Sequence, residues 1–153
     1  MPGQERSPVL TNRKAWHEYI IDETYEAGIV LVGTEVKSLR AGRANLQDAY
    51  CKIENSEVWL HGMHISPYEF GNRYNVDPLR PRKLLLKRDE IDRLMAKVLQ
   101  RGYALIPLKL YFDRGYAKVQ IGLGRGKKLY DKRRAIAERD AEMERRRAES
   151  GRT

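Results

Sequence analysis

The sequence predicts a mainly β fold with helices: a small antiparallel, OB-like β-barrel with about three helices and a basic C-terminal tail. Three observations lead to this fold. Short segments rich in β-branched and aromatic residues recur between turn signals, as they do in all-β domains. Glycines interrupt the longest of these segments, and glycine bends help strands to close a small barrel. The last thirty residues contain too few apolar side chains for a core of their own.

The chain divides into three predicted parts. Residues 1–11 hold prolines, a glycine and polar side chains, and we expect them to form a disordered lead. Residues 12–124 are the predicted OB-like barrel, and residues 125–153 are the predicted basic tail. A chain of 153 residues is long enough for one domain with a proper core.

The charge of the chain indicates a polyanionic partner. Lys and Arg number 30 against 21 Asp and Glu, a net charge of +9. The charge fits either nucleic acid or an anionic membrane, and nucleic acid is the predicted partner of such a domain; a soluble basic protein without such a partner is the alternative. The one cysteine, Cys51, excludes an internal disulfide and fits a reducing compartment. Because there is no apolar leader and no apolar run of about 18 residues, we expect a cytoplasmic protein without a membrane partner.

The first part of the barrel is predicted to hold a helical turn, a bent strand and a short helix. Asn12 can cap a helical turn with its side chain. Aromatic and β-branched residues favour a strand over residues 16–25, and Gly28 interrupts that pattern with a bulge or bend. A short helix is expected between an N-cap at Thr34 and a stop at Gly42.

The middle of the chain is predicted to form a hairpin followed by a long loop. Apolar residues alternate over residues 48–60, and polar residues 54–57 supply the turn. Residues 69–83 contain several Arg and Lys side chains among glycines and prolines. Loops of this length are usually functional or disordered.

The last part of the barrel is predicted to be a helix and two strands. Apolar residues over 91–99 follow the spacing of a helix face, and Gly102 stands where a helix stops. Residues 103–112 form a buried strand in which Pro107 indicates an edge or a bulge. A final alternating strand ends at Gly124.

The tail is highly charged and almost without a core. Residues 124–153 carry eleven Lys and Arg against six Asp and Glu, and Leu129, Ile136 and Met143 make only a thin apolar stripe. A helix of this length is marginal without a packing surface. We therefore predict that the tail is disordered in the free protein and helical when RNA holds it. A permanently helical, solvated C-terminus is the alternative.

Individual residues suggest contacts to RNA. Glu26 sits beside the glycine interruption in a cationic protein, and a carboxylate can accept from a base amino group; an exposed barrel charge is the alternative. Lys37 and Arg40 lie one turn apart and could clamp a phosphate or form a solvated helix face. Tyr130 could stack on an unpaired base or pack back on the barrel.

Neither a catalytic nor a metal site is predicted. The glycine-rich stretch 122–127 fails as a phosphate loop, because Ile121 replaces its first glycine and Lys128 the Ser or Thr after the lysine. We expect these glycines to form a flexible exit from the last strand. One cysteine and scattered histidines lack zinc-site spacing, and the sequence offers no Ser-His-Asp pattern or facing carboxylate pair. We expect no enzyme activity, no cofactor and no metal.

Several contiguous blocks, in order from residue 12 to residue 133, are far more specific than any single short motif. They are Asn12-Arg13-Lys14-Ala15, His17-Glu18-Tyr19, Glu26-Ala27-Gly28, Gly33-Thr34-Glu35-Val36-Lys37-Ser38-Leu39-Arg40, Asp77-Pro78, Arg82-Lys83-Leu84-Leu85-Leu86, Gly126-Lys127-Lys128 and Asp131-Lys132-Arg133. In these blocks the sequence resembles the SsrA-binding protein (small protein B, SmpB) family of bacterial trans-translation. Residues 135–153 match that family in character more than in letters.

The resemblance implies an OB-like barrel that binds the tRNA-like domain of transfer-messenger RNA (SsrA RNA). It implies delivery of that RNA to stalled ribosomes, which are rescued while their incomplete proteins are tagged. Four residues match family contacts to the RNA: Glu26 and Leu85 on the barrel, and Lys127 and Lys128 at the root of the tail.

The resemblance also implies the ribosome as a partner. The tail enters the empty messenger channel as a helix, and Asp131, Lys132 and Arg133 match the family's motif at the decoding centre of the small-subunit RNA. Tyr130 takes a position where some relatives carry histidine. Elongation factor Tu with aminoacylated transfer-messenger RNA is a further implied partner, and we expect a monomer. A basic structural ribosomal protein, a general RNA chaperone and a small nuclease are the alternatives.

Amide hydrogen exchange checks the predicted state of the tail. In the free protein, amides over residues 132–147 should exchange almost without protection, because few apolar contacts support a helix there. Amides of the predicted barrel strand at residues 117–123 are the protected control. Protection across 132–147 would contradict the prediction and favour the permanently helical tail.

Overall fold

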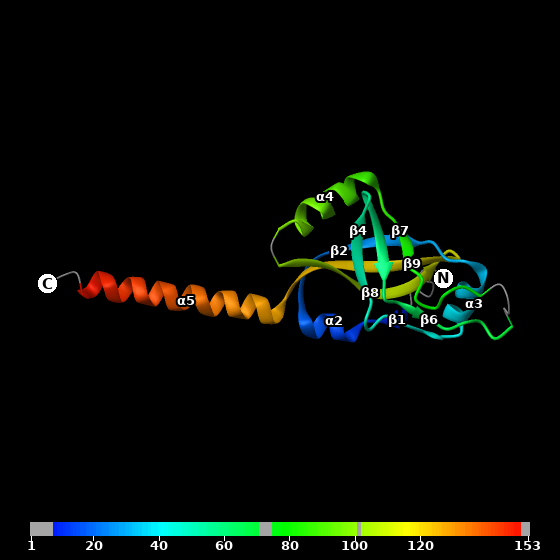
Figure 1. Cartoon of the computed structure of the whole chain (residues 1–153), viewed down its shortest axis with the longest axis horizontal. Helices are drawn as coiled ribbons and strands as arrows, with labels where there is room; N and C mark the ends of the chain where they lie inside the picture. The colour runs from blue at the N-terminus through cyan, green and yellow to red at the C-terminus, as the bar shows by residue number, and fades with distance from the viewer. Residues whose placement is uncertain (1–7, 71–74, 101, 151–153) are drawn as a thin grey trace.

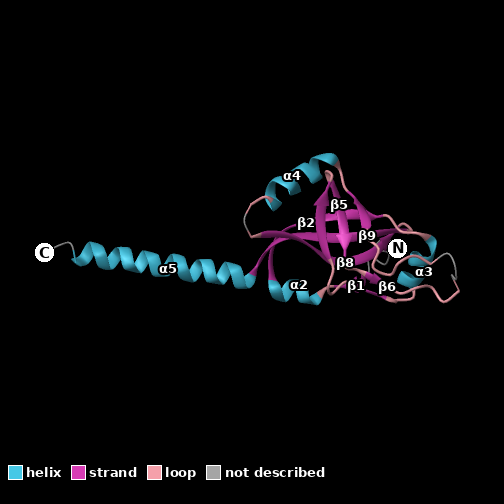
Figure 2. Cartoon of the chain, viewed as in Figure 1, coloured by secondary structure: helices cyan, strands magenta, loops and turns pink. Residues whose placement is uncertain are grey.

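The computed structural model describes residues 8–70, 75–100 and 102–150. Figure 1 shows a body of strands with one long helix, α5 (Lys127–Ser150), projecting from one end of it. Figure 2 shows that strands form the centre of the body and that shorter helices lie around it. The described residues form a mainly β protein with four helices, in agreement with the predicted class.

The strands of the described chain are β1 (Pro8–Thr11), β2 (Tyr19–Ile29), β3 (Ala44–Asn45), β4 (Tyr50–Glu54), β5 (Glu57–His61), β6 (His64–Ile65), β7 (Arg82–Leu85), β8 (Tyr103–Asp113) and β9 (Tyr116–Gly126). The helices of the body are α2 (Arg13–Glu18), α3 (Gly33–Arg40) and α4 (Arg88–Val98). Within the described part of the chain, no helix is long and apolar enough to span a membrane.

Seven strands form one large antiparallel sheet. Their order is β1-β8-β4-β5-β7-β2-β9, and β9 pairs a second time, with β8. β3 and β6 pair separately. The main core lies on the inner face of the large sheet and includes Leu84 and Leu110, both fully buried. A smaller cluster of Ala15, Ile106 and Leu108 packs α2 against β8.

The start of the chain corrects one prediction. Pro8–Thr11, placed in a disordered lead, forms strand β1 and pairs with β8. Asn12 anchors this segment, because its side chain donates to Pro107 O (2.9 Å) and its backbone N–H donates to Leu108 O (2.8 Å). Residues 1–7 of the predicted lead lie outside the described residues.

The predicted cap at Asn12 is confirmed, and the helix that it begins is longer than one turn. Asn12 Oδ1 accepts from the Ala15 N–H (3.3 Å), and α2 continues to Glu18. Trp16 therefore lies in a helix, although the composition of residues 16–25 favoured a strand that began at Trp16. The cap satisfies an N–H that a helix start would otherwise leave unpaired, and this local bond outweighs the strand preference of one aromatic residue.

The bulge predicted as one of two possibilities at Gly28 does not occur there. β2 runs through Gly28 to Ile29, and its register shift lies between Ile21 and Glu23 instead. Gly28 faces Leu85 on β7, and a Cβ built on Gly28 would lie 3.4 Å from the Leu85 Cβ. The glycine therefore allows a side chain from the neighbouring strand to lie over the sheet.

The long strands β8 and β9 confirm one prediction and correct another. A register shift between Pro107 and Lys109 confirms the predicted bulge. β9 does not end in a flexible exit at Gly124, because it continues to Gly126. A Cβ on Gly124 would lie 2.8 Å from the Ile20 carbonyl oxygen, so this glycine permits close approach of β2 and β9.

The predicted hairpin and the predicted amphipathic helix are confirmed. Asn55 and Ser56 connect β4 to β5 with positive φ angles of 51° and 61°, as a tight hairpin turn requires. α4 buries Ile91 and Leu94. The tail is helical as α5, and the predicted disorder of the tail in the free protein stays a prediction.

Three charged side chains meet inside the body, beside the loop for which the sequence predicted clustered cations. Arg82 is 0% exposed and Glu35 is 3% exposed. Arg82 Nε donates to Glu35 Oε2 (2.8 Å), and the other Arg82 nitrogens donate to Pro78 O (3.0 Å) and Met63 O. Arg80 also donates to Glu35. Two of the predicted loop cations are therefore structural and are not free to bind phosphate.

The charge on Glu35 balances the buried charge of Arg82. Burial by itself would raise the pKa of Glu35, but hydrogen bonds from Arg80, from the Val32 N–H and from Arg82 hold that pKa below its ordinary value. The carboxylate is therefore ionised at neutral pH. Its partners join α3 to β7 and to the segment before β7, so the cluster links three parts of the chain.

Replacing Glu35 by Gln should lower the free energy of unfolding by about 3–5 kcal/mol at pH 7. The reason is that Arg82 would keep a buried charge without its counter-ion. Urea denaturation measures this loss. Glu138→Gln is the matched control, because the ion pair of Glu138 with Arg134 is exposed, and it should change the free energy by less than about 0.5 kcal/mol.

The loss in Glu35→Gln should also depend on pH. A carboxyl group whose pKa is lower in the folded state stabilises the fold above its unfolded-state pKa, about 4.3. That stabilisation disappears as the pH falls through the folded-state pKa. The difference between the parent protein and the variant should therefore be full at pH 7 and shrink below about pH 4. A difference independent of pH would contradict this role of Glu35.

Candidate nucleic-acid interface

The structure brings Glu26 and Leu85 together on the outer face of the large sheet. Side chains alternate along β2, so that Ala27 and Ile29 are buried in the core while Glu26 is exposed. Gly28 shares the outer face with Glu26 and pairs with Leu85. Two residues that lie 59 positions apart in the sequence therefore occupy neighbouring places on one surface.

Leu85 is an exposed apolar side chain held in a fixed place. It is 54% exposed, and its Cβ, Cγ and Cδ1 all lie within 4 Å of the position that a Cβ on Gly28 would take. The missing side chain at Gly28 leaves the room that Leu85 occupies. An apolar side chain flat on a sheet is a suitable support for the face of a base.

Polar and cationic groups surround this apolar support. The Tyr111 hydroxyl donates to Glu26 Oε2. Across the ladder, Gln120 pairs with Glu26, and Lys118 pairs with Gly28. The outer face thus combines an acceptor, an amide, a cation and an apolar surface, which is the set of groups that a protein uses to hold an unpaired base and its phosphate.

Lys37 and Arg40 lie elsewhere, on α3, which Figure 1 shows at the end of the body away from α5. Both side chains are exposed. Lys37 Nζ lies 5.3 Å from the centroid of the Tyr68 ring, and the Arg40 guanidinium carbon lies 4.1 Å from that of Phe112. Each cation is held over its own ring, so the predicted phosphate clamp would bind away from the root of the tail.

The root of the tail is attached to α2. Lys127 Nζ donates to the Trp16 carbonyl oxygen (2.9 Å), and Trp16 itself is 49% exposed. The side chain of Lys128, the next residue, is exposed. The structure therefore places Lys127, one of the two predicted contacts, against the body and leaves the side chain of Lys128 exposed to solvent.

The predicted decoding-centre residues, Tyr130, Asp131, Lys132 and Arg133, lie in the first two turns of α5. Of these four residues, Lys132 and Arg133 have exposed side chains.

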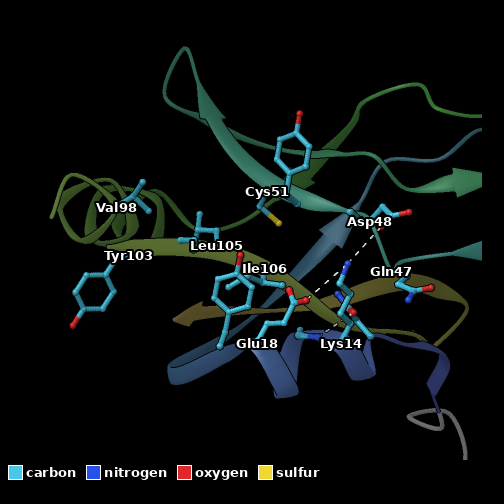
Figure 3. A pocket seen from close by; sticks show the side chains of 15 residues that line it. Lys14, Glu18, Gln47, Asp48, Cys51, Val98, Tyr103, Leu105 and Ile106 are labelled. Carbon is cyan, nitrogen blue, oxygen red and sulfur yellow. Dashed lines mark hydrogen bonds and ion pairs between the residues drawn. The ribbon is translucent and has the colours of Figure 1, made fainter. Parts of the chain in front are cut away.

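A cleft that sequence reasoning missed lies between α2, β4 and β8 (Figure 3). The volume of the cleft is about 470 Å³. The side chain of Lys14 lies across it, with its Nζ 3.9 Å from Glu18 Oε1 and 4.0 Å from Asp48 Oδ1. Burial raises the pKa of the Cys51 thiol in its wall, which disfavours the thiolate. No cluster of three potential metal ligands occurs in the described residues. Only the tertiary structure assembles this cleft, because its walls come from distant segments.

The net charge, the outer face around Glu26 and the basic helix together define a nucleic-acid-binding class of protein. The sequence profile of the SmpB protein family matches residues 9–150. The chain belongs to the SmpB family, and the resemblance found in its sequence is confirmed.

Individual relatives and a solved structure agree with this assignment. The SsrA-binding protein of Desulforudis audaxviator is 59% identical over 151 residues, which cover 99% of both chains. That of Caldicellulosiruptor bescii is 62% identical over 136 residues, covering 89% of this chain and 86% of the relative. A chain in a structure described as "tmRNA-SmpB: a journey to the center of the bacterial ribosome" is 56% identical, with a TM-score of 0.66, and the match covers 79% of this chain and 85% of that one.

Replacing Leu85 by Ser should weaken RNA binding without unfolding the protein. The side chain is more than half exposed, so the free energy of unfolding should change by less than about 1 kcal/mol. Loss of the apolar support should weaken binding of a structured RNA with unpaired bases about tenfold. Filter binding measures the affinity, and Leu99→Ser, at a residue that is 87% exposed on the far end of α4, is the control. Equal RNA affinities of Leu85→Ser and Leu99→Ser would show that Leu85 is not part of the interface.

Proposed function

We propose that this protein binds the tRNA-like domain of transfer-messenger RNA and delivers it to stalled ribosomes for trans-translation. One observation carries the proposal: relatives named SsrA-binding protein match this chain over its body and its tail together, up to 99% of its length. The solved relative is described with transfer-messenger RNA and the ribosome. Binding, not catalysis, is the proposed activity, since these relatives bear the name of an RNA-binding protein.

The two parts of the chain have separate roles in this proposal. The body binds the RNA through Glu26 and Leu85 on the outer face and through Lys127 and Lys128 at the root of the tail. The exposure of Leu85, the bond from Tyr111 to Glu26 and the seat of Lys127 on α2 support these contacts. Lys37 and Arg40, at the end of the body away from α5, bind phosphates of the RNA backbone that lie outside these contacts.

The tail is the part that enters the ribosome. α5 carries Tyr130, Asp131, Lys132 and Arg133 into the empty messenger channel near the decoding centre of the small-subunit RNA. Its Ile136 and Met143 support this role, because both side chains are exposed beyond the root of α5 on the body and are available to a partner. The basic side chains along α5 suit a channel walled by ribosomal RNA.

Four further parts of the proposal complete this function. The ring of pairings from β8 through β4, β5, β7, β2 and β9 back to β8 supports a closed, OB-like barrel. We propose that the protein acts as a monomer in the cytoplasm. It acts together with elongation factor Tu, which accompanies the aminoacylated RNA.

A basic structural ribosomal protein or a general RNA chaperone is the alternative function. Constant one-to-one presence of the protein on ribosomes would favour the structural ribosomal protein.

Cutting the chain after Gly126 tests the division of labour. The truncated body should keep most of its affinity for transfer-messenger RNA, because the outer face is intact. Tagging of nascent chains on stalled ribosomes should be lost, because the helix that enters the channel is missing. Filter binding and a tagging assay on ribosomes stalled without a stop codon give the two readouts, with the full-length chain as control.

Normal tagging by the truncated body would refute the role of the tail. Equal loss of RNA binding and of tagging would also contradict the proposal, because it would place the main RNA contacts beyond Gly126. Titrating salt in the binding assay adds a third readout. The slope of log affinity against log salt should become shallower by the contribution of two cations, since the cut removes Lys127 and Lys128 while Lys37 and Arg40 remain.

A further inference from the structure

A buried tyrosine holds the exposed carboxylate of the outer face. Tyr111 is 5% exposed, and its hydroxyl donates to Oε2 of Glu26, which is an exposed side chain on another strand. An unrestrained glutamate on a surface samples many rotamers, and ordering it on binding costs free energy. A bond from a rigid donor removes part of that cost before the partner arrives.

The surroundings of Tyr111 keep its hydroxyl in place. On β8 it pairs with Pro8 of β1 on one side and with Lys118 of β9 on the other. The ammonium group of Lys109 lies 5.7 Å from the centroid of its ring. Strand pairing on both edges and a cation near the ring restrict the motion of the side chain, so the hydroxyl is a fixed reference point for Glu26.

Glu26 stands beside groups that suit a base. Leu85 presents an apolar surface next to it, and Gln120 lies opposite it across the ladder. A base stacked on Leu85 would point its polar edge at the carboxylate and the amide. An ionised carboxylate only accepts hydrogen bonds, so the edge that fits must present amino or imino N–H groups.

A negative charge here also works against unspecific binding. In a protein of net charge +9, Glu26 repels the phosphates of any RNA that lies across the sheet without offering a donor. Only a base with N–H groups at the right place compensates this repulsion. The same carboxylate therefore favours one arrangement of RNA and disfavours others.

We propose that Tyr111 is a positioning residue for RNA recognition: it aims Glu26 at an unpaired base that lies on Leu85 and presents N–H donors on its edge. The inference rests on the proposed function, and it adds the specificity device and the chemical class of the base. Tyr111 acts through Glu26 and does not itself touch the RNA.

Tyr111→Phe is the test, because it removes the hydroxyl and keeps the ring. The full-length variant should bind the tRNA-like domain of transfer-messenger RNA about tenfold more weakly, since a hydrogen bond to a charged group is lost. Binding to bulk tRNA should not change. The slope of log affinity against log salt should also stay the same, because no phosphate contact is removed.

Tyr25→Phe is the matched control, on the strand that carries Glu26. It removes a hydrogen bond of the same type, from the Tyr25 hydroxyl to Glu23 Oε2 (2.6 Å), at a glutamate outside the proposed site. It should leave both RNA affinities unchanged. A similar loss in Tyr25→Phe would show a general effect of the sheet and overturn the proposal.

A double-mutant cycle shows whether Tyr111 acts through Glu26. Glu26→Gln should weaken specific binding by at least as much as Tyr111→Phe, and the double variant should bind no more weakly than Glu26→Gln alone. Additive losses would mean that Tyr111 acts independently, and unchanged affinity in Tyr111→Phe would mean that it does not act. Either result overturns the proposal.

The outcomes also separate this inference from the proposed function. If the parent protein showed no preference for the tRNA-like domain over bulk tRNA, both would fail. If the parent showed the preference and Tyr111→Phe kept it, only the positioning role would fail. Thermal melts monitor folding, and if Tyr111→Phe melts below the assay temperature, Glu26→Asp replaces it. That variant keeps the charge but withdraws the carboxylate from the hydroxyl, and undiminished specific binding would then overturn the proposal.

Discussion

The buried pair of Glu35 and Arg82 is the interaction on which the arrangement of the body depends. Arg82 is the first residue of β7, and its bonds to Glu35, Met63 and Pro78 connect that strand to three other segments. A charge inside a protein is tolerated only when it is paired and hydrogen-bonded. The bonds of Arg82 therefore help to fix where β7 lies in the sheet. In that place, Leu85 of β7 lies opposite Gly28 of β2.

The outer face follows from this arrangement together with the glycines. Gly28 admits Leu85 to the surface of the sheet, while Gly124 lets β2 and β9 approach closely enough to pair along almost their whole length. β9 in turn pairs with β8, which brings Tyr111 to Glu26. The buried ion pair is therefore close to the proposed interface: it holds β7, and β7 contributes Leu85 to the outer face.

The body and the tail are stabilised in different ways. The body buries apolar side chains on one face of a sheet, so its structure is set within the chain. α5 exposes Ile136 and Met143 and makes i, i+4 ion pairs such as Arg146 with Glu142, which contribute little to helix stability. A helix with so little packing along its length gains support from a partner, which is in keeping with the proposed role of the tail.

The sequence by itself determined the mainly β class, the N-cap at Asn12, the hairpin turn at Asn55 and Ser56, the bulge at Pro107 and the family. These features depend on local chemistry or on contiguous letters, which can be read along the chain. The tertiary structure alone decided that Pro8–Thr11 is a strand, that Gly28 and Gly124 serve close packing, that Arg82 is buried, and that Tyr111 meets Glu26. Each of these depends on contact between segments far apart in the sequence, and neither residue type nor spacing records which distant segments will pair.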